Sequence, residues 1–323
     1  MQNTIRDLVL QATGADDALQ IETIQSLWSG YGYILRYGLS GGDSASVIVK
    51  HVKLSAQSLQ TPGSNEDLSH RRKVRSYQIE AVWYQRWAKH CDADCRVPAC
   101  LAFEMFGEDI VMVLEDLHPV GFPQRHARAG EREIRTCLNW LANFHATFIG
   151  EKPKGLWPTG TYWHLQTRPN ELAALQDIAL KNAAPAIDQK LRDTPYQTFV
   201  HGDAKVANFC FSADGRRVAA VDFQYVGGGC GIKDVAYFID SCLGQDECQR
   251  RESELLDIYF QALQQALRSK QKTVDADAVE RDWRALYPLA WTDFHRFLKG
   301  WSPGYWSPNS YSERLARQVI AQL

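Results

Sequence analysis

The chain has 323 residues, of which 45% are hydrophobic, and its formal net charge at pH 7 is −2. This length suits one large two-lobed domain or two domains with a sizeable core, and the near-neutral charge gives no electrostatic reason to expect nucleic acid or acidic lipid as a partner. The N-terminus lacks a basic stretch followed by an apolar one, and no apolar run approaches the roughly 20 residues of a membrane-spanning helix. We therefore expect a cytoplasmic protein without a membrane segment.

Short apolar runs alternate with glycine in the N-terminal part of the chain, which is typical of strands joined by turns. The pattern predicts strands at residues 29–37, 46–52, 100–106 and 109–114. A turn at residues 41–43 joins the first two strands, and the last two form a hairpin. Between the pairs we expect an exposed loop at residues 55–70 and a helix at residues 72–90.

The last of these strands stops abruptly at residue 115, shortly before Pro119, which indicates a crossing between two lobes. We therefore predict a small N-terminal lobe, residues 1–114, with an antiparallel sheet and one helix. The remainder, residues 115–323, is expected to form a larger and mostly helical lobe. Apolar residues at helical spacing predict a helix at residues 131–149. We also expect a solvent-facing helix at residues 181–193 and mostly helical structure beyond residue 246.

The segment from residue 199 to residue 224 carries the polar side chains that we expect to perform chemistry. Residues 212–217 contain an Asp-Gly pair between two apolar stretches, which predicts a hairpin turn. Asn208 begins the first strand of this hairpin and Asp222 ends the second, so the two lie at adjacent strand ends. Asp203 lies on the loop that leads to the same edge. The sequence therefore predicts that three oxygen-bearing side chains converge.

Such a group of side chains suits phosphoryl transfer. Mg²⁺ is a hard cation that prefers carboxylate and amide oxygens, which Asp222 and Asn208 supply. Asp203 can hold an incoming hydroxyl and accept its proton. Asp and Asn are common in loops because they form turns. Here, however, the segment with Asp203 and Asn208 and the segment with Asp222 are joined by a hairpin, and this combination indicates a functional site.

The pattern His-Gly-Asp-x4-Asn at residues 201–208, followed by Val-Asp-Phe at residues 221–223, resembles the catalytic and metal loops of the aminoglycoside phosphotransferase and choline kinase superfamily. The continuation Gly-x-Gly-x-x-Asp-Val-Ala-Tyr-Phe at residues 229–238 is similar to the ecdysteroid-kinase-like (CHK-type) branch. Residues 115–117 resemble the interlobe hinge of that branch, and His145 with Ala146 resembles its helix before the catalytic loop. The resemblance covers most of the chain from about residue 28 to residue 240 and implies an α+β, two-lobed, protein-kinase-like fold.

The resemblance implies roles for the matching residues. Asp203 corresponds to the catalytic aspartate, and Asn208 and Asp222 correspond to the Mg²⁺ ligands. Lys50 corresponds to the lysine that contacts the α- and β-phosphates of ATP, with Lys53 as the competing assignment. Alternation along a strand puts these two lysines on opposite faces, and we choose Lys50 because an uninterrupted apolar strand leads into it.

The same resemblance suggests further nucleotide contacts. Glu80 is the expected ion-pair partner of Lys50, because the segment Glu-x3-Tyr at residues 80–84 matches the family. Backbone groups of Glu115 and Leu117 are expected to bind adenine. Gly30 and Gly32 match the phosphate-covering loop incompletely, since a third glycine is missing at the expected spacing, and the glycines within residues 38–42 are an alternative.

Two further residues belong to the catalytic loop or its support. His201 is assigned to the catalytic loop together with Asp203, and we expect it to brace the loop through its ring nitrogens rather than to perform chemistry. Asp234 is expected to support the loop by capping backbone amides at a helix start.

The acceptor is expected to bind near Asp203, and the aromatic segment at residues 291–301 has the composition to line its site. Asp293, Phe297 and Trp301 are the candidate contacts there, by a weak analogy to the aromatic segment with which choline kinases hold a quaternary ammonium. The segment has no large acidic cluster, which favours a sterol-like or aromatic alcohol, or an amino alcohol, over a polycationic aminoglycoside.

The sequence thus predicts an ATP- and Mg²⁺-dependent kinase that phosphorylates a hydroxyl of a small choline-, sterol- or aminoglycoside-type alcohol. A nucleotide-binding pseudokinase that acts as a scaffold, or a kinase that acts on a protein, are the alternatives. The presence of Lys50, Asp203, Asn208 and Asp222 together argues against the first. The short segment between Asp222 and Asp234 leaves little room for a peptide platform and argues against the second.

Overall fold

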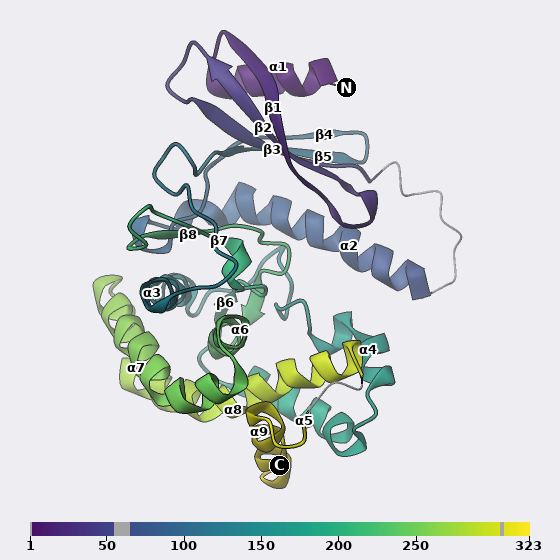
Figure 1. Cartoon of the computed structure of the whole chain (residues 1–323), viewed down its shortest axis with the longest axis vertical. Helices are drawn as coiled ribbons and strands as arrows, with labels where there is room; N and C mark the ends of the chain where they lie inside the picture. The colour runs from purple at the N-terminus through teal and green to yellow at the C-terminus, as the bar shows by residue number, and fades with distance from the viewer. Residues whose placement is uncertain (1, 55–64, 304–306) are drawn as a thin grey trace. The chain divides into compact units, whose positions relative to one another are not determined.

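The structure is a computed structural model that describes residues 2–54, 65–303 and 307–323. It is of the α+β class, with a five-stranded antiparallel sheet in the N-terminal region and helices through most of the C-terminal region (Figure 1). The predicted fold class is therefore confirmed. The contacts divide the chain into two compact units, and both units are discontinuous in sequence. The first comprises Met1–Asp92, Arg96–Gln124 and Cys210–Val221, and the second comprises Ala93–Cys95, Arg125–Phe209 and Asp222–Leu323.

The sheet of the first unit has the strand order β1-β2-β3-β5-β4 and is antiparallel throughout. Its strands are β1 (Asp17–Ser26), β2 (Gly32–Ser40), β3 (Ser46–Val52), β4 (Cys100–Phe106) and β5 (Asp109–Glu115). The helices of this unit are α1 (Gln2–Thr13) and α2 (Asn65–Val82), and α2 continues as a π-helical turn over Trp83–Trp87. A small hairpin of β7 (Phe209–Phe211) and β8 (Val218–Ala220) contributes Cys210 and Ala219 to an apolar cluster with Leu117 and Phe122.

Helix α1 covers one face of this sheet. Ile5 and Val9, one helical turn apart, pack against buried residues that include Val47 and Val49 of β3. Because side chains alternate along a strand, Lys50 lies on the face of β3 opposite to Val49 and α1. The position of α1 therefore determines which face of the sheet carries the lysine.

Several predicted elements agree with the structure, and others do not. The strands at residues 46–52 and 100–106 have the predicted bounds. The first strand does not begin at residue 29, because Ser29 and Gly30 adopt positive φ angles of 56° and 75° within a short 3-10 turn. Helix α2 already begins at Asn65, which is earlier than predicted, and residues 55–64 of the predicted loop lie outside the described residues. Helix α1 and strand β1 were not predicted.

The second unit is mostly helical. Its longer helices are α3 (Glu131–Phe148), α5 (Ile178–Asp193), α6 (Ile232–Cys242), α7 (Gln245–Ser269), α8 (Ala276–Trp301) and α9 (Tyr311–Ala321), with a short α4 at Pro169–Ala174. Strand β6 (Thr198–Val200) pairs with β9 (Gly227–Gly229) and leads into the segment that carries Asp203. In the described part of the chain, no helix combines the length and the apolar character needed to cross a membrane.

Candidate active site

The loop that carries Asp203 follows β6 and ends where β7 begins. Gly202 turns this loop with a φ of +80°, and a Cβ atom at this position would lie 2.2 Å from the carbonyl oxygen of Tyr225. Only glycine therefore fits there without a shift of the backbone. The turn directs Asp203 into a buried position, where 7% of the residue remains exposed.

Both carboxylate oxygens of Asp203 accept hydrogen bonds. Oδ1 accepts from the Tyr237 hydroxyl at 2.9 Å, and Oδ2 accepts from Nδ2 of Asn208 at 3.0 Å and from Nζ of Lys205 at 3.1 Å. Nδ2 of Asn208 also donates to the Asp203 carbonyl at 2.8 Å. Since the nitrogen of the Asn208 amide faces Asp203, its oxygen is the atom that suits a metal ion.

Asp222 follows β8 in a left-handed conformation, with a φ of 69°. Positive φ is uncommon outside glycine and is concentrated at functional sites. Nε2 of Gln224 donates a hydrogen bond to Oδ1 of Asp222 at 2.6 Å. Burial raises the pKa of the Asp203 carboxyl, the nearby charge of Asp222 raises it further, and Lys205 opposes both effects.

The structure therefore brings Asp203, Asn208 and Asp222 together within the second unit. Two carboxylates that repel one another, with an amide oxygen beside them, form a donor set that suits a hard divalent cation. The described residues contain no cluster of three or more His, Cys, Asp or Glu side chains with metal-binding geometry. A magnesium site at this place would thus rest on Asp222 and on the amide of Asn208, with water and phosphate as further ligands.

Asp234, in the first turn of α6, holds the loop that carries Asp203. Its carboxylate accepts hydrogen bonds from the backbone N–H groups of His201 at 2.5 Å and of Gly202 at 3.0 Å. Nε2 of His145 lies 3.2 Å from the same carboxylate. The predicted amide contacts of Asp234 are present, but they go to the catalytic loop, while the N-cap of α6 is Gly231.

His201 is fully buried, and its Nδ1 accepts a hydrogen bond from the backbone N–H of Asp203 at 3.2 Å. Its ring packs against Phe223, with ring centroids 4.5 Å apart. These contacts fix the loop on either side of Gly202, and the bracing role of His201 stays a prediction.

In the first unit, Nζ of Lys50 lies 2.6 Å from Oε2 of Glu80, and both side chains are buried. The predicted contact between these residues is therefore present. Lys53 lies beyond the end of β3, with its Nζ over the ring of Tyr33 at 5.2 Å. A buried ion pair holds an ammonium group in one position more firmly than the contact of the half-buried Lys53 with a ring, which favours Lys50 as the candidate phosphate-binding lysine.

The remaining predicted nucleotide contacts lie at or just beyond the ends of strands of the same sheet. Glu115 ends β5, and its backbone N–H donates to the carbonyl of Ala99 at 2.9 Å. Leu117 is buried, and its carbonyl accepts from the N–H of Phe122. Gly30 lies in the turn between β1 and β2, and Gly32 begins β2. A Cβ atom on Gly32 would lie 1.9 Å from the carbonyl oxygen of His51, so strand packing alone requires this glycine.

The acceptor candidates all lie on α8, but their environments differ. Asp293 is buried, and its carboxylate contacts Nη2 of Arg296 at 2.9 Å and Nζ of Lys233 at 3.3 Å. Burial would raise the pKa of Asp293, but these two cations outweigh it and lower the pKa to about 2. Phe297 is buried and stacks with Trp301, which is 65% exposed.

Three residues near the catalytic loop were not predicted. Tyr237 contacts Asp203 directly, and the ring of Tyr162 lies 5.6 Å from the ring of Tyr237. The guanidinium of Arg168 lies over the rings of both Tyr162 and Phe297, at 5.8 and 5.4 Å. Tyr237 falls within the Asp-Val-Ala-Tyr-Phe motif, three residues after Asp234, so helical spacing could have placed both residues on one face.

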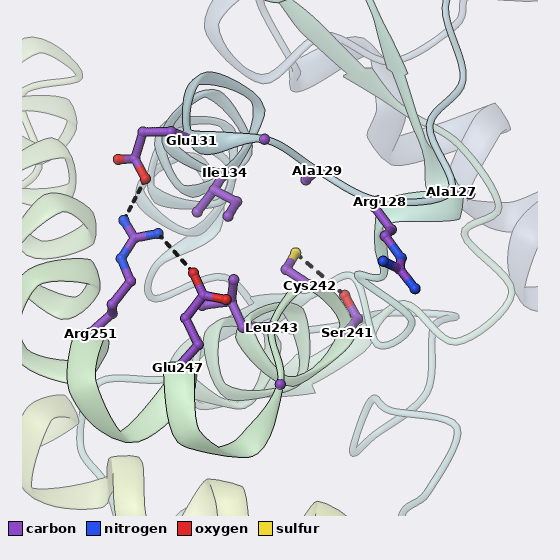
Figure 2. A pocket seen from close by; sticks show the side chains of 12 residues that line it. Ala127, Arg128, Ala129, Glu131, Ile134, Ser241, Cys242, Leu243, Glu247 and Arg251 are labelled. Carbon is purple, nitrogen blue, oxygen red and sulfur yellow. Dashed lines mark hydrogen bonds and ion pairs between the residues drawn. The ribbon is translucent and has the colours of Figure 1, made fainter.

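A separate cavity of about 850 Å³ lies in the second unit (Figure 2). It is lined by residues 127–131, Ile134, residues 241–244, Glu247 and Arg251. On one wall, Arg251 is ion-paired with Glu131 at 2.5 Å and with Glu247 at 3.6 Å. None of the predicted site residues lines this cavity.

Comparison with known proteins yields a match to one family. Residues 160–272 match the model of the Ecdysteroid kinase-like family. This segment contains Asp203, Asn208, Asp222 and Asp234, so the predicted resemblance is confirmed where the motifs are strongest. No curated protein matches the chain.

Solved structures resemble the chain over most of its length. The microcompartment-associated aminopropanol kinase has 16% sequence identity and a TM-score of 0.51, with 99% of this chain and 98% of that chain covered. An ethanolamine kinase from Plasmodium vivax has 11% identity and a TM-score of 0.47, with 92% and 80% covered. The aminoglycoside phosphotransferase APH(3'')-Id from Streptomyces rimosus has 14% identity and a TM-score of 0.41, with 80% and 90% covered. The likeness to the first of these structures shows a kinase-like fold. The match to the Ecdysteroid kinase-like family model supports a phosphotransferase with a hydroxyl acceptor.

Proposed function

We propose that this chain is an ATP- and Mg²⁺-dependent kinase that transfers the γ-phosphoryl group of ATP to a hydroxyl of a small molecule. The observation that carries the proposal is the contact between Asp203 and Asn208, with Asp222 beside them, on a loop whose amides are held by Asp234. A carboxylate and an amide that are buried, with a half-buried second carboxylate beside them, are the parts that phosphoryl transfer requires.

In this proposal Asp203 holds the acceptor hydroxyl through a carboxylate oxygen. The hydroxyl oxygen forms a bond to the γ-phosphorus, the bond between that phosphorus and the β–γ bridging oxygen breaks, ADP leaves, and the hydroxyl proton passes to Asp203. Asn208 and Asp222 would hold Mg²⁺, which supplies positive charge to the phosphate oxygens when bound. Lys205 and Asn208 keep Oδ2 of Asp203 engaged, so the carboxylate cannot rotate freely.

The proposal also assigns nucleotide-binding roles to residues of the first unit. Lys50, held by Glu80, would bind the α- and β-phosphates. The backbone carbonyl of Glu115 would accept a hydrogen bond from the adenine amino group, since the N–H of Glu115 already donates to Ala99. The N–H of Leu117 would donate to the ring. The turn that carries Gly30 would cover the phosphates.

For the acceptor, we propose an uncharged or anionic alcohol rather than a quaternary ammonium. Binding an ammonium requires aromatic faces or a carboxylate that are not already paired with a cation. Arg168 already lies over Tyr162 and Phe297, and Lys233 and Arg296 already neutralise Asp293. Trp301, which is largely exposed, remains the candidate contact for an apolar part of the acceptor.

Two measurements test this function. ATP should raise the melting temperature in the presence of Mg²⁺ and much less with EDTA, because the metal ion joins Asp222 to the phosphates. A panel of sterol, aromatic, acidic and amino alcohols, assayed for ADP release, then identifies the acceptor class. Equal stabilisation by ATP with Mg²⁺ and with EDTA would contradict the metal site, and a preference for choline-type alcohols would contradict the acceptor class.

A further inference from the structure

Tyr237 donates a hydrogen bond to the carboxylate that we propose as the proton acceptor. Its hydroxyl lies 2.9 Å from Oδ1 of Asp203, and 6% of the residue is exposed. Burial and the charge of Asp203 both raise the pKa of Tyr237, so the phenol keeps its proton at neutral pH. Its single hydroxyl proton is therefore available for a lasting bond to Asp203.

Helix α6 contacts the loop that carries Asp203 both through its backbone and through the Asp203 side chain. Asp234 binds the backbone amides of His201 and Gly202, and Tyr237, three residues later on the same helix face, binds the side chain of Asp203. The loop backbone and its reactive side chain are thus held by one rigid element.

Aromatic neighbours hold the Tyr237 ring in place. Its centroid lies 4.8 Å from that of Phe294, 5.0 Å from that of Trp163 and 5.6 Å from that of Tyr162. A ring enclosed on these sides cannot change rotamer without moving its neighbours, so its hydroxyl has one position.

The hydrogen-bond donors around Asp203 leave one lone-pair site of its carboxylate for a further donor. A carboxylate offers about four lone-pair sites, two on each oxygen. Asn208 and Lys205 occupy both sites on Oδ2, and Tyr237 occupies one on Oδ1. The remaining site is on Oδ1, next to the Tyr237 hydroxyl.

We propose that Tyr237 is a positioning residue that orients Asp203, so that the second lone pair of Oδ1 receives the acceptor hydroxyl. This inference rests on the proposed kinase function. It assigns Oδ1, rather than Oδ2, as the atom that accepts the hydroxyl proton, and it makes the orientation of Asp203 depend on α6.

The test is the Tyr237→Phe variant, which removes only the hydroxyl. The probe is Mg-ATP, first with water as the phosphoryl acceptor and then with the best alcohol from the panel. We expect kcat to fall about 10- to 100-fold, because a misdirected carboxylate loses alignment, while the KM for ATP changes less than about twofold. The matched control is Tyr287→Phe, which removes the hydroxyl of a fully buried tyrosine of α8 and should leave kcat unchanged.

A second measurement does not depend on turnover. In protein labelled with ¹³C at the aspartate carboxyl groups, the Asp203 resonance, assigned through Asp203→Asn, should shift in Tyr237→Phe and stay in place in Tyr287→Phe. If the wild type is active but Tyr237→Phe keeps its kcat, or if the Asp203 resonance does not shift in Tyr237→Phe, the inference is wrong while the proposed function stands. A wild type that neither binds Mg-ATP nor releases ADP overturns the proposed function, and the inference falls with it.

Discussion

The ammonium of Lys50 and the carboxylate of Glu80 form a buried ion pair, with Nζ and Oε2 separated by 2.6 Å. Removal of one partner of such a pair leaves an uncompensated buried charge, which typically costs about 3–5 kcal/mol. The pair therefore contributes to folding as well as to the proposed phosphate contact.

These two contributions can be separated. Lys50→Met should abolish phosphoryl transfer and lower the free energy of unfolding by about 3 kcal/mol. Adding Glu80→Gln should restore much of the stability, because no buried charge remains, without restoring activity. Urea unfolding and ADP release measure the two effects, and Lys53→Met is the control that should keep most of both. Loss of transfer in Lys53→Met, with activity retained in Lys50→Met, would move the phosphate contact to the other lysine.

Asp203 and Asp222 should respond differently to the same isosteric change. Asp203→Asn removes the proposed proton acceptor, so turnover should fall by roughly 10²–10⁴-fold while Mg-ATP affinity changes little. Asp222→Asn removes the proposed charged metal ligand, so Mg²⁺-dependent ATP binding should weaken together with turnover. Asparagine also tolerates the positive φ at Asp222, which keeps backbone strain out of the comparison. Calorimetric ATP titrations at matched Mg²⁺ measure both affinities. If only Asp203→Asn lost Mg-ATP binding, the roles assigned to Asp203 and Asp222 would have to be exchanged.

Asp293 should behave as a structural residue. Asp293→Asn leaves Lys233 and Arg296 buried without their shared carboxylate, so the free energy of unfolding should fall by about 3–5 kcal/mol. Trp301→Ala, at an exposed position of the same helix, should change it by less than about 0.5 kcal/mol. Chemical denaturation measures both. Unchanged stability in Asp293→Asn, together with a raised KM for the alcohol, would instead support the acceptor contact predicted from the sequence.

A cluster of charges joins α5, α8 and α9 and should make stability depend on acid pH. Nζ of Lys299 lies 2.9 Å from Asp177 and 2.5 Å from Glu313. Contacts with His295 and Lys299 lower the pKa of Glu313 to about 2, and for Asp177 the contact with Lys299 outweighs burial and lowers its pKa to about 2.

Because both folded-state pKa values lie below the unfolded ones, this stabilisation is complete above about pH 5 and is lost as the pH falls toward 2. Glu313→Gln should therefore reduce stability at pH 7 by about 2 kcal/mol and make the unfolding free energy less dependent on pH between 5 and 2. Glu104→Gln, at an exposed position of β4, is the control. An identical pH dependence in Glu313→Gln and in the wild type would contradict the cluster's role.

The elements that the sequence predicted well have a single clear periodicity. Strand β3 is apolar and buried, and its bounds were predicted correctly. Strand β1 escaped prediction because most of its side chains are exposed and its register shifts twice, between Gln20 and Glu22 and between Thr23 and Gln25, which breaks the alternation of a regular strand. Helix α1 could have been found from Ile5 and Val9, whose spacing places them on one helix face.

The candidate site was likewise predicted from the sequence only in part. Asp203, Asn208 and Asp222 lie within one short segment, where a motif and a hairpin suffice to place them together. Tyr162 and Arg168 approach the catalytic loop from a distant part of the chain, and their contacts depend on how the helices pack. No local pattern contains that information, so only the folded structure shows that a guanidinium already covers the aromatic rings.

The discontinuity of the first unit has a consequence for synthesis on the ribosome. Helix α1 is made before the strands on which it packs, and Val111 and Val113, which share its apolar cluster, follow about a hundred residues later. The hairpin at Cys210–Val221, which packs on Leu117 and Phe122, is made later still. The apolar cluster of α1 can be completed once Val113 has been made, but the cluster around Leu117 remains incomplete while residues 125–209 of the second unit are being made. Domains usually fold one after another along the chain, but here the first unit is completed only after residues 125–209 of the second unit have been made.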